Sequence, residues 1–167
     1  MRQAVWLAMA IMLLLPAGKV YSRNKSEREN NTLRIMSYNI RNGRGMDDAA
    51  NYQRTADVIN KACPDLVAVQ EIDSVTGRSG GKDVLRELAG LTFMHYVYAP
   101  AIDYDGGKYG IGMLSKEKPL GYRYLPLPGR EEARALLVVE FERYIYCCTH
   151  LSLTEEDRML SLPIIKQ

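Results

Sequence analysis

A short, valine-rich apolar run within residues 65–72, DLVAVQEI, constrains the fold more than any other feature of this chain. Leucine, valine and alanine follow one another there without the regular polar alternation of a half-exposed strand. We therefore expect a buried strand, of the kind found in covered α/β sheets. The run reaches polar Gln70 and Glu71 at its carboxyl end, which is where strands of such sheets deliver functional groups.

The rest of the chain alternates between strand and helix patterns. Apolar positions at helical spacing predict helices at about 49–62 and 82–89, and a further helix after Thr154. Strands are expected at 33–40, 65–72, 93–99, 109–115, 133–141 and 144–151. The last two are separated by only Glu142 and Arg143, which predicts an antiparallel hairpin.

The amino-terminal residues have the pattern of a secretory signal. Arg2 precedes an almost wholly apolar stretch at residues 5–16, and small residues follow it. This stretch is shorter than the roughly 20 residues that span a bilayer, so we predict a cleaved signal peptide at 1–22 and no stable membrane anchor. Polar residues 23–31 are expected to be a flexible lead-in to a domain at 32–167. The protein would then be secreted or periplasmic.

The charge of the mature chain gives little bulk attraction for polyanions. The formal net charge is +2, and the predicted signal peptide contains Arg2 and Lys19 but no acidic residue. Its removal leaves a neutral chain. Since nonspecific nucleic-acid binding rests mainly on phosphate neutralisation by Lys and Arg, only a local basic cleft could support it here.

Four motifs in a fixed order, with an R-A-L segment at 134–136, together resemble one known family. They are S-Y-N-I at 37–40, P-D-L-V-A-V-Q-E-I at 64–72, Y-G-I-G-M-L-S-K at 109–116 and C-T-H-L at 148–151. This order is similar to that of the endonuclease/exonuclease/phosphatase superfamily, which includes deoxyribonucleases and neutral sphingomyelinases. The resemblance implies an α/β fold in which a sandwich of mixed β-sheets is flanked by helices, as in deoxyribonuclease.

The resemblance also implies roles for particular residues. Glu71 would be the main ligand of Mg2+ or Mn2+, which prefer hard oxygen donors. Asn39 would orient that carboxylate, assist at the metal or contact the scissile phosphate, and His150 would aid proton transfer at the phosphate. Arg134 and Arg41 would contact substrate phosphate. A strand-end ion pair is the alternative for Arg134, and a solvated loop arginine is the alternative for Arg41.

Two further family elements have no counterpart in this chain: a Gly-Asp-X-Asn motif and a terminal Asp-His pair. We therefore expect about half of the full domain, roughly one sheet with its helices, truncated at its carboxyl end and inactive by itself. The predicted function is a secreted metal-dependent phosphoester hydrolase. The substrate could be nucleic acid, a lipid headgroup or a sugar phosphate, and no specific protein partner is inferred. The alternative is a noncatalytic binding or interaction module on the same fold.

Overall fold

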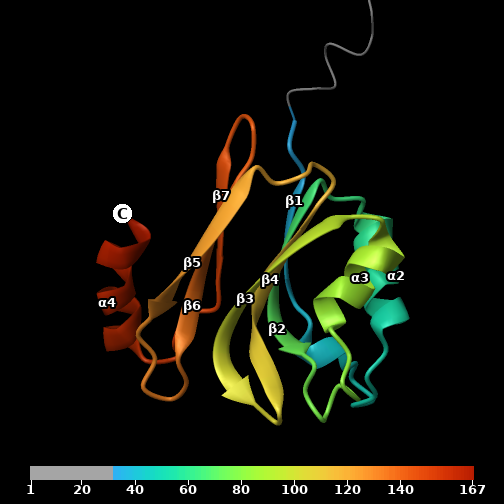
Figure 1. The fold of residues 1–167 in the computed structure, drawn as a ribbon, viewed down its shortest axis with the longest axis horizontal. Coiled ribbons are helices and arrows are strands. Elements are labelled where there is room, and N and C mark those ends of the chain that lie inside the picture. The colour runs from blue at the N-terminus through green and yellow to red at the C-terminus, as the bar shows by residue number, and fades with distance from the viewer. Residues whose placement is uncertain (1–31) are drawn as a thin grey trace, which may run out of the picture. The chain divides into compact units, whose positions relative to one another are not determined.

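A computed structural model describes residues 32–167 of the chain. The predicted signal peptide at 1–22 and the whole predicted lead-in at 23–31 lie outside the described residues. Figure 1 shows two β-sheets packed face to face, with helices on both outer sides. Within residues 32–167, no helix has the length and apolar character needed to cross a membrane. The elements are β1 (Ile35–Asn39), the 3-10 helix η1 (Arg41–Gly43), α2 (Tyr52–Ala62), β2 (Leu66–Ser74), α3 (Val84–Thr92), β3 (His95–Tyr104), β4 (Gly107–Ser115), β5 (Gly121–Leu127), β6 (Arg134–Glu140), β7 (Ile145–Thr149) and α4 (Glu155–Ile165).

The two sheets differ in strand direction. The first has the order β1-β2-β4-β3, with β1 and β2 parallel and the remaining neighbours antiparallel. The second has the order β5-β6-β7 and is antiparallel throughout. This arrangement confirms the predicted α/β sandwich of mixed sheets, and it confirms the hairpin of β6 and β7.

Three apolar cores hold the layers together. Val69 and Leu114 of the first sheet pack against α2 and α3, while Ala68 and Met113, on the opposite face, pack against the second sheet. Leu136 and Val138 on the outer face of the second sheet pack near the end of α4. Because β2 contributes to a core on each of its faces, its residues are apolar at successive positions, as the sequence indicated.

The expectation of roughly one sheet is wrong, because β5, β6 and β7 form a second sheet that covers the first. Leu137 and Val139 of β6 are fully buried in the core between the sheets. Strand β5 was missed by the sequence analysis because Pro126 lies within it. Proline cannot donate a ladder hydrogen bond and is tolerated mainly at sheet edges, which is the position of β5.

Two element boundaries also differ from the expected ones. Strand β3 continues through Tyr104, beyond its expected end at residue 99, and forms a hairpin with β4 that turns at Asp105 and Gly106. Strand β2 continues to Ser74 and therefore does not end at Glu71. The side chain of Glu71 leaves the sheet at an irregularity within the strand, described next.

Candidate functional site

Asn39 and Glu71 come together where β1 ends beside β2. The parallel register places Asn39 next to Gln70, and Asn39 Nδ2 donates a hydrogen bond of 2.6 Å to Glu71 Oε1. A hydrogen bond to an ionised carboxylate is stronger than one between neutral groups. The amide therefore fixes the orientation of the carboxylate, which is one of the roles expected for Asn39.

Glu71 occupies a β-bulge in the middle of β2. Its neighbours Gln70 and Ile72 pair with the consecutive residues Ile111 and Gly110 of β4, so Glu71 is the extra residue. Its φ of 60° lies in the left-handed region, which costs a non-glycine residue about 1–2 kcal/mol. Bulges re-aim a side chain, and here the carboxylate is partly exposed between two buried neighbours.

The segment after Asn39 turns back sharply and is tied to the same amide. The backbone N–H of Arg41 donates to Asn39 Oδ1 at 3.0 Å, and both Arg41 and Asn42 have positive φ. The Arg41 side chain is exposed and forms no ion pair with any residue of 32–167. The segment thus adds an exposed arginine two residues after Asn39.

Arg78 and Asp73 support this segment and were missed by the sequence analysis. Arg78 donates two hydrogen bonds to the Asp73 carboxylate, at 2.7 and 2.8 Å, and a third to Asn42 Oδ1 at 3.0 Å. Its guanidinium also lies over the rings of Tyr104 and Tyr109, at 4.2 and 5.1 Å from their centroids. The Asp73 side chain is only 1% exposed. A buried carboxylate requires a partner, but Asp73 directly follows the apolar run of 65–72 and gave no signal of its burial in the sequence.

His150 and Arg134 lie together at the same end of the sandwich, Arg134 at the start of β6 and His150 directly after β7. They line a small cavity of about 10 Å³ with Tyr109, Ile111 and Glu132. Burial raises the pKa of Tyr109, and the nearby carboxylates Glu71 and Glu132 raise it further. Tyr109 therefore connects the surroundings of Glu71 with those of His150.

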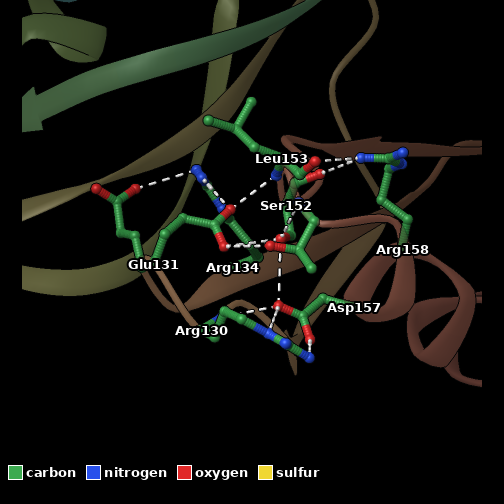
Figure 2. A network of polar contacts seen from close by, with 9 residues as sticks. Arg130, Glu131, Arg134, Ser152, Leu153, Asp157 and Arg158 are labelled. Atoms are coloured by element: carbon green, nitrogen blue, oxygen red, sulfur yellow. Dashed lines mark hydrogen bonds and ion pairs between the residues drawn. The ribbon is translucent and has the colours of Figure 1, made fainter.

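The guanidinium of Arg134 is already paired with two carboxylates. It is buried and donates to Glu131 and Glu132, both at 3.1 Å, while its Nε has no partner among the described residues. Figure 2 shows that Glu131 also accepts from Ser152 Oγ, at 2.8 Å, and from the Leu153 backbone N–H, at 2.7 Å. These hydrogen bonds lower the pKa of Glu131 to about 2. The strand-end ion pair considered for Arg134 is therefore present.

Contacts between the sheets bring the pair of Asn39 and Glu71 to the same end as Arg134 and His150. Gln70 Nε2 donates to Cys148 Sγ at 3.7 Å, and these residues directly precede Glu71 and closely precede His150. Within residues 32–167, however, no hydrogen bond or ion pair joins Glu71 to His150 or Arg134. The structure places all five expected residues near this end, but only Asn39, Glu71 and the Arg41 backbone are in direct contact.

The donor atoms at Glu71 suit a divalent ion that is shared with water and substrate. Among residues 32–167, no group of three or more His, Cys, Asp or Glu side chains is arranged to hold a metal. Mg2+ often needs only one or two protein carboxylates, because water and phosphate oxygens complete its shell. Glu71 provides one such carboxylate, and Asn39 keeps it oriented.

Comparisons with known proteins agree on one family. A model of the Endonuclease/Exonuclease/phosphatase family matches residues 36–152. Three solved structures are similar. An endonuclease/exonuclease/phosphatase from Beutenbergia cavernae DSM 12333 has a TM-score of 0.66 and 23% identity over 80% of this chain. An endonuclease/exonuclease/phosphatase family protein from Leptotrichia buccalis C-1013-b has a TM-score of 0.60 and 10% identity over 81% of this chain, and TDP2 from Caenorhabditis elegans has a TM-score of 0.53 and 17% identity over 80% of it. At these identities the likeness shows the fold alone. The chain spans 43%, 64% and 39% of those three chains, respectively. No curated protein matches it.

Proposed function

Because the chain belongs to the endonuclease/exonuclease/phosphatase family, we propose that it serves as an exported, metal-dependent phosphoester hydrolase with Glu71 at its reactive site. The family is hydrolytic and acts on phosphoesters. Export is proposed from the pattern of residues 1–22 alone. The metal is proposed from the chemistry of the donor atoms.

The hydrogen bond of 2.6 Å between Asn39 and Glu71 carries the proposal. A strained bulge that exposes a carboxylate between buried neighbours has no packing benefit, and strained backbone clusters at functional sites. The amide prevents the carboxylate from rotating freely. A preorganised carboxylate of this kind is what phosphoester hydrolysis needs at its metal.

A divalent ion such as Mg2+ or Mn2+ held at Glu71 would neutralise phosphoryl oxygens and lower the pKa of bound water. We propose that the exposed guanidinium of Arg41 contacts the substrate phosphate. His150 is proposed to exchange a proton there, since a hard ion does not need imidazole as a ligand. Arg134 is held by Glu131 and Glu132, and its unpartnered Nε is the guanidinium nitrogen that we propose for a phosphate contact.

The test compares Glu71→Gln with Glu140→Gln, which alters an exposed carboxylate on β6 that forms no ion pair within the described residues. Both variants are assayed on a chromogenic phosphodiester with Mg2+ and with Mn2+, in the 167-residue chain and in any longer product of the same reading frame. In whichever form is active, Glu71→Gln should lower kcat/KM by at least about 100-fold, and Glu140→Gln should leave it unchanged. Near-normal turnover by Glu71→Gln would remove Glu71 from the mechanism.

A second comparison separates His150 from the metal. His150→Ala should lower kcat by about 100-fold or more while leaving metal affinity, measured by calorimetry, unchanged. An equal loss of metal binding would contradict the proposed role. If every form is folded, binds phosphate compounds and is inactive with both metals, the noncatalytic binding module becomes the better description.

The substrate class is part of the proposal and is tested directly. Nucleic acid, a lipid headgroup and a sugar phosphate all present the phosphoester that Glu71 and Arg41 would face. The turnover rate of the active form is measured on oligonucleotides, on phospholipids and on phosphorylated sugars, and the fastest of the three identifies the substrate class.

A further inference from the structure

An open groove lies at the other end of the first sheet from Glu71. It has a volume of about 680 Å³ and is bordered by the last turn of α3, the start of β3 and the segment leading into β5. His95, at the start of β3, pairs with Ser115 of β4, and Ser115 pairs on its other side with Leu66 at the start of β2. Glu71 lies five residues further along β2, which is roughly 16 Å at the rise of a strand. The groove is therefore separate from the candidate active site.

Aromatic rings form an exposed part of the groove wall. Phe93, Tyr96 and Tyr122 all line it, and each is exposed, Phe93 to 95%. A large apolar side chain that is almost fully exposed gains nothing from burial, and contiguous exposed apolar surface often marks an interaction site. The three rings come from two different layers of the fold and face one groove.

The backbone at Phe93 supports a functional reason for its exposure. Phe93 directly follows α3 with a φ of 56°, a left-handed conformation that favours glycine at the end of a helix. Phenylalanine pays a steric penalty there, and its ring forms no buried contact in return. Such an outlier is a reason to look for a ligand.

The charges lining the groove are all of one sign. Arg86 and Lys118 line it, and neither forms an ion pair with any residue of 32–167. No carboxylate lines it. Among the carboxylates nearest in sequence, Glu87 is paired with Lys82, and Glu117 accepts hydrogen bonds from the Glu142 backbone and from Tyr144. The groove thus combines two uncompensated cations with exposed rings, in a chain whose overall charge is close to neutral.

We propose that this groove binds single-stranded nucleic acid, with bases stacked on Phe93, Tyr96 and Tyr122 and phosphates paired with Arg86 and Lys118. A basic groove with aromatic rings for base stacking is the combination by which proteins hold single strands without reading their sequence. A membrane surface is a poorer match, because lipid bilayers bind protruding apolar faces and this site is concave. A closed acyl-chain site is also a poorer match, because the groove is open and two of its rings carry hydroxyl groups.

The test measures binding of a fluorescein-labelled oligothymidylate of about twelve nucleotides to the 167-residue chain by fluorescence anisotropy. Phe93→Gly removes the ring and relieves the left-handed strain. Affinity should therefore fall about tenfold, while the thermal midpoint rises by about 3 °C. Arg86→Gln and Lys118→Gln should each reduce the slope of log K against log salt by about 0.7.

Matched controls separate the groove from the candidate active site and from general surface effects. Met159→Ala on α4 removes another exposed apolar side chain, and Lys61→Ala on α2 removes another cation without an ion pair in the described region. Neither should change the affinity, and the measurement needs no turnover, so the groove can fail or succeed independently of the proposed hydrolase. Unchanged binding by Phe93→Gly and Arg86→Gln would overturn the proposal. Binding to phosphatidylglycerol vesicles that these variants abolish, with no binding of the oligonucleotide, would overturn it in favour of a lipid surface.

Discussion

Glu71 and Glu131 show how differently the chain uses two carboxylates at one end of the sandwich. Glu71 receives a single side-chain hydrogen bond, from Asn39, and stays partly exposed. Glu131 is surrounded by donors from Arg134, Ser152 and Leu153. A carboxylate that is saturated with hydrogen bonds from its own protein serves structure, whereas one that is oriented and accessible remains free to bind a ligand.

The first prediction concerns acid stability and Glu131. Its pKa is lowered from an ordinary value of 4.5 to about 2, so folding favours the ionised form. The stabilisation that it provides is complete above about pH 4.5 and is lost as the pH falls toward 2. Glu131→Gln should therefore lower the thermal midpoint at pH 7, and the difference from the unaltered chain should shrink progressively below pH 4.5. A difference that stays constant from pH 7 to pH 2.5 would show that the carboxylate charge contributes nothing.

At the scale of elements, the ends of strands and helices are fixed by contacts from distant segments. Helix α4 begins after Thr154, as the sequence indicated, but the Thr154 side chain forms no capping hydrogen bond. Instead, Asp157 in the first turn accepts from the backbone and the side chain of Arg130. The helix is therefore anchored to the segment before β6, and this contact also keeps Ser152 beside Glu131.

The second prediction concerns β4, which lies between two irregular strands. A Cβ atom at Gly110 would clash with the Ala99 carbonyl oxygen of β3, and backbone cannot move aside as a flexible side chain can. Gly110→Ala should destabilise the fold by about 1–3 kcal/mol. Because Gly110 pairs with Ile72 next to the bulge, metal-dependent activity should also fall.

Gly90→Ala is the matched control, because a Cβ atom there meets nothing within 4 Å. Alanine should be neutral or stabilising at this position in α3. Urea unfolding of both variants provides the measurement. Equal midpoints for the two would contradict the close approach of β3 and β4.

For the molecule as a whole, the first sheet couples the two flanking layers. Its strands bury side chains on one face against α2 and α3 and on the other against the second sheet. Loss of either covering layer would expose apolar residues of β2 to water. Domains that share a core in this way generally unfold in a single step.

The third prediction follows from this coupling. Leu137 is fully buried between the sheets, and Leu137→Ala should destabilise the fold by about 2–5 kcal/mol. The helical circular dichroism signal and the tyrosine fluorescence should shift together to lower urea concentration, although Leu137 is on the layer away from α2 and α3. Two separate transitions would instead mean that the second sheet unfolds independently.

The periodicity of apolar residues in the sequence, and the residues that end each apolar run, determined which segments are buried strands and helices. The apolar run of β2 required cover on both faces, and the structure provides it. Asn39 and Glu71 were expected near the ends of their strands, and the parallel register of β1 and β2 brings them into contact. The burial of β2 follows locally, because it is indicated by the spacing of apolar and polar residues, whereas the contact between Asn39 and Glu71 needs the pairing of β1 with β2.

The tertiary structure alone decided which partners the charged residues have. Arg134 is neutralised by Glu131 and Glu132, Arg78 holds the distant Asn42, and Glu71 leaves the sheet through a bulge set by pairing with β4. The groove beside Phe93 likewise exists only because β5, hidden in the sequence by Pro126, lies next to α3 and β3. The charge of a side chain is known from the sequence. Its partner depends on which segments lie beside it, and packing between segments far apart in the chain decides that.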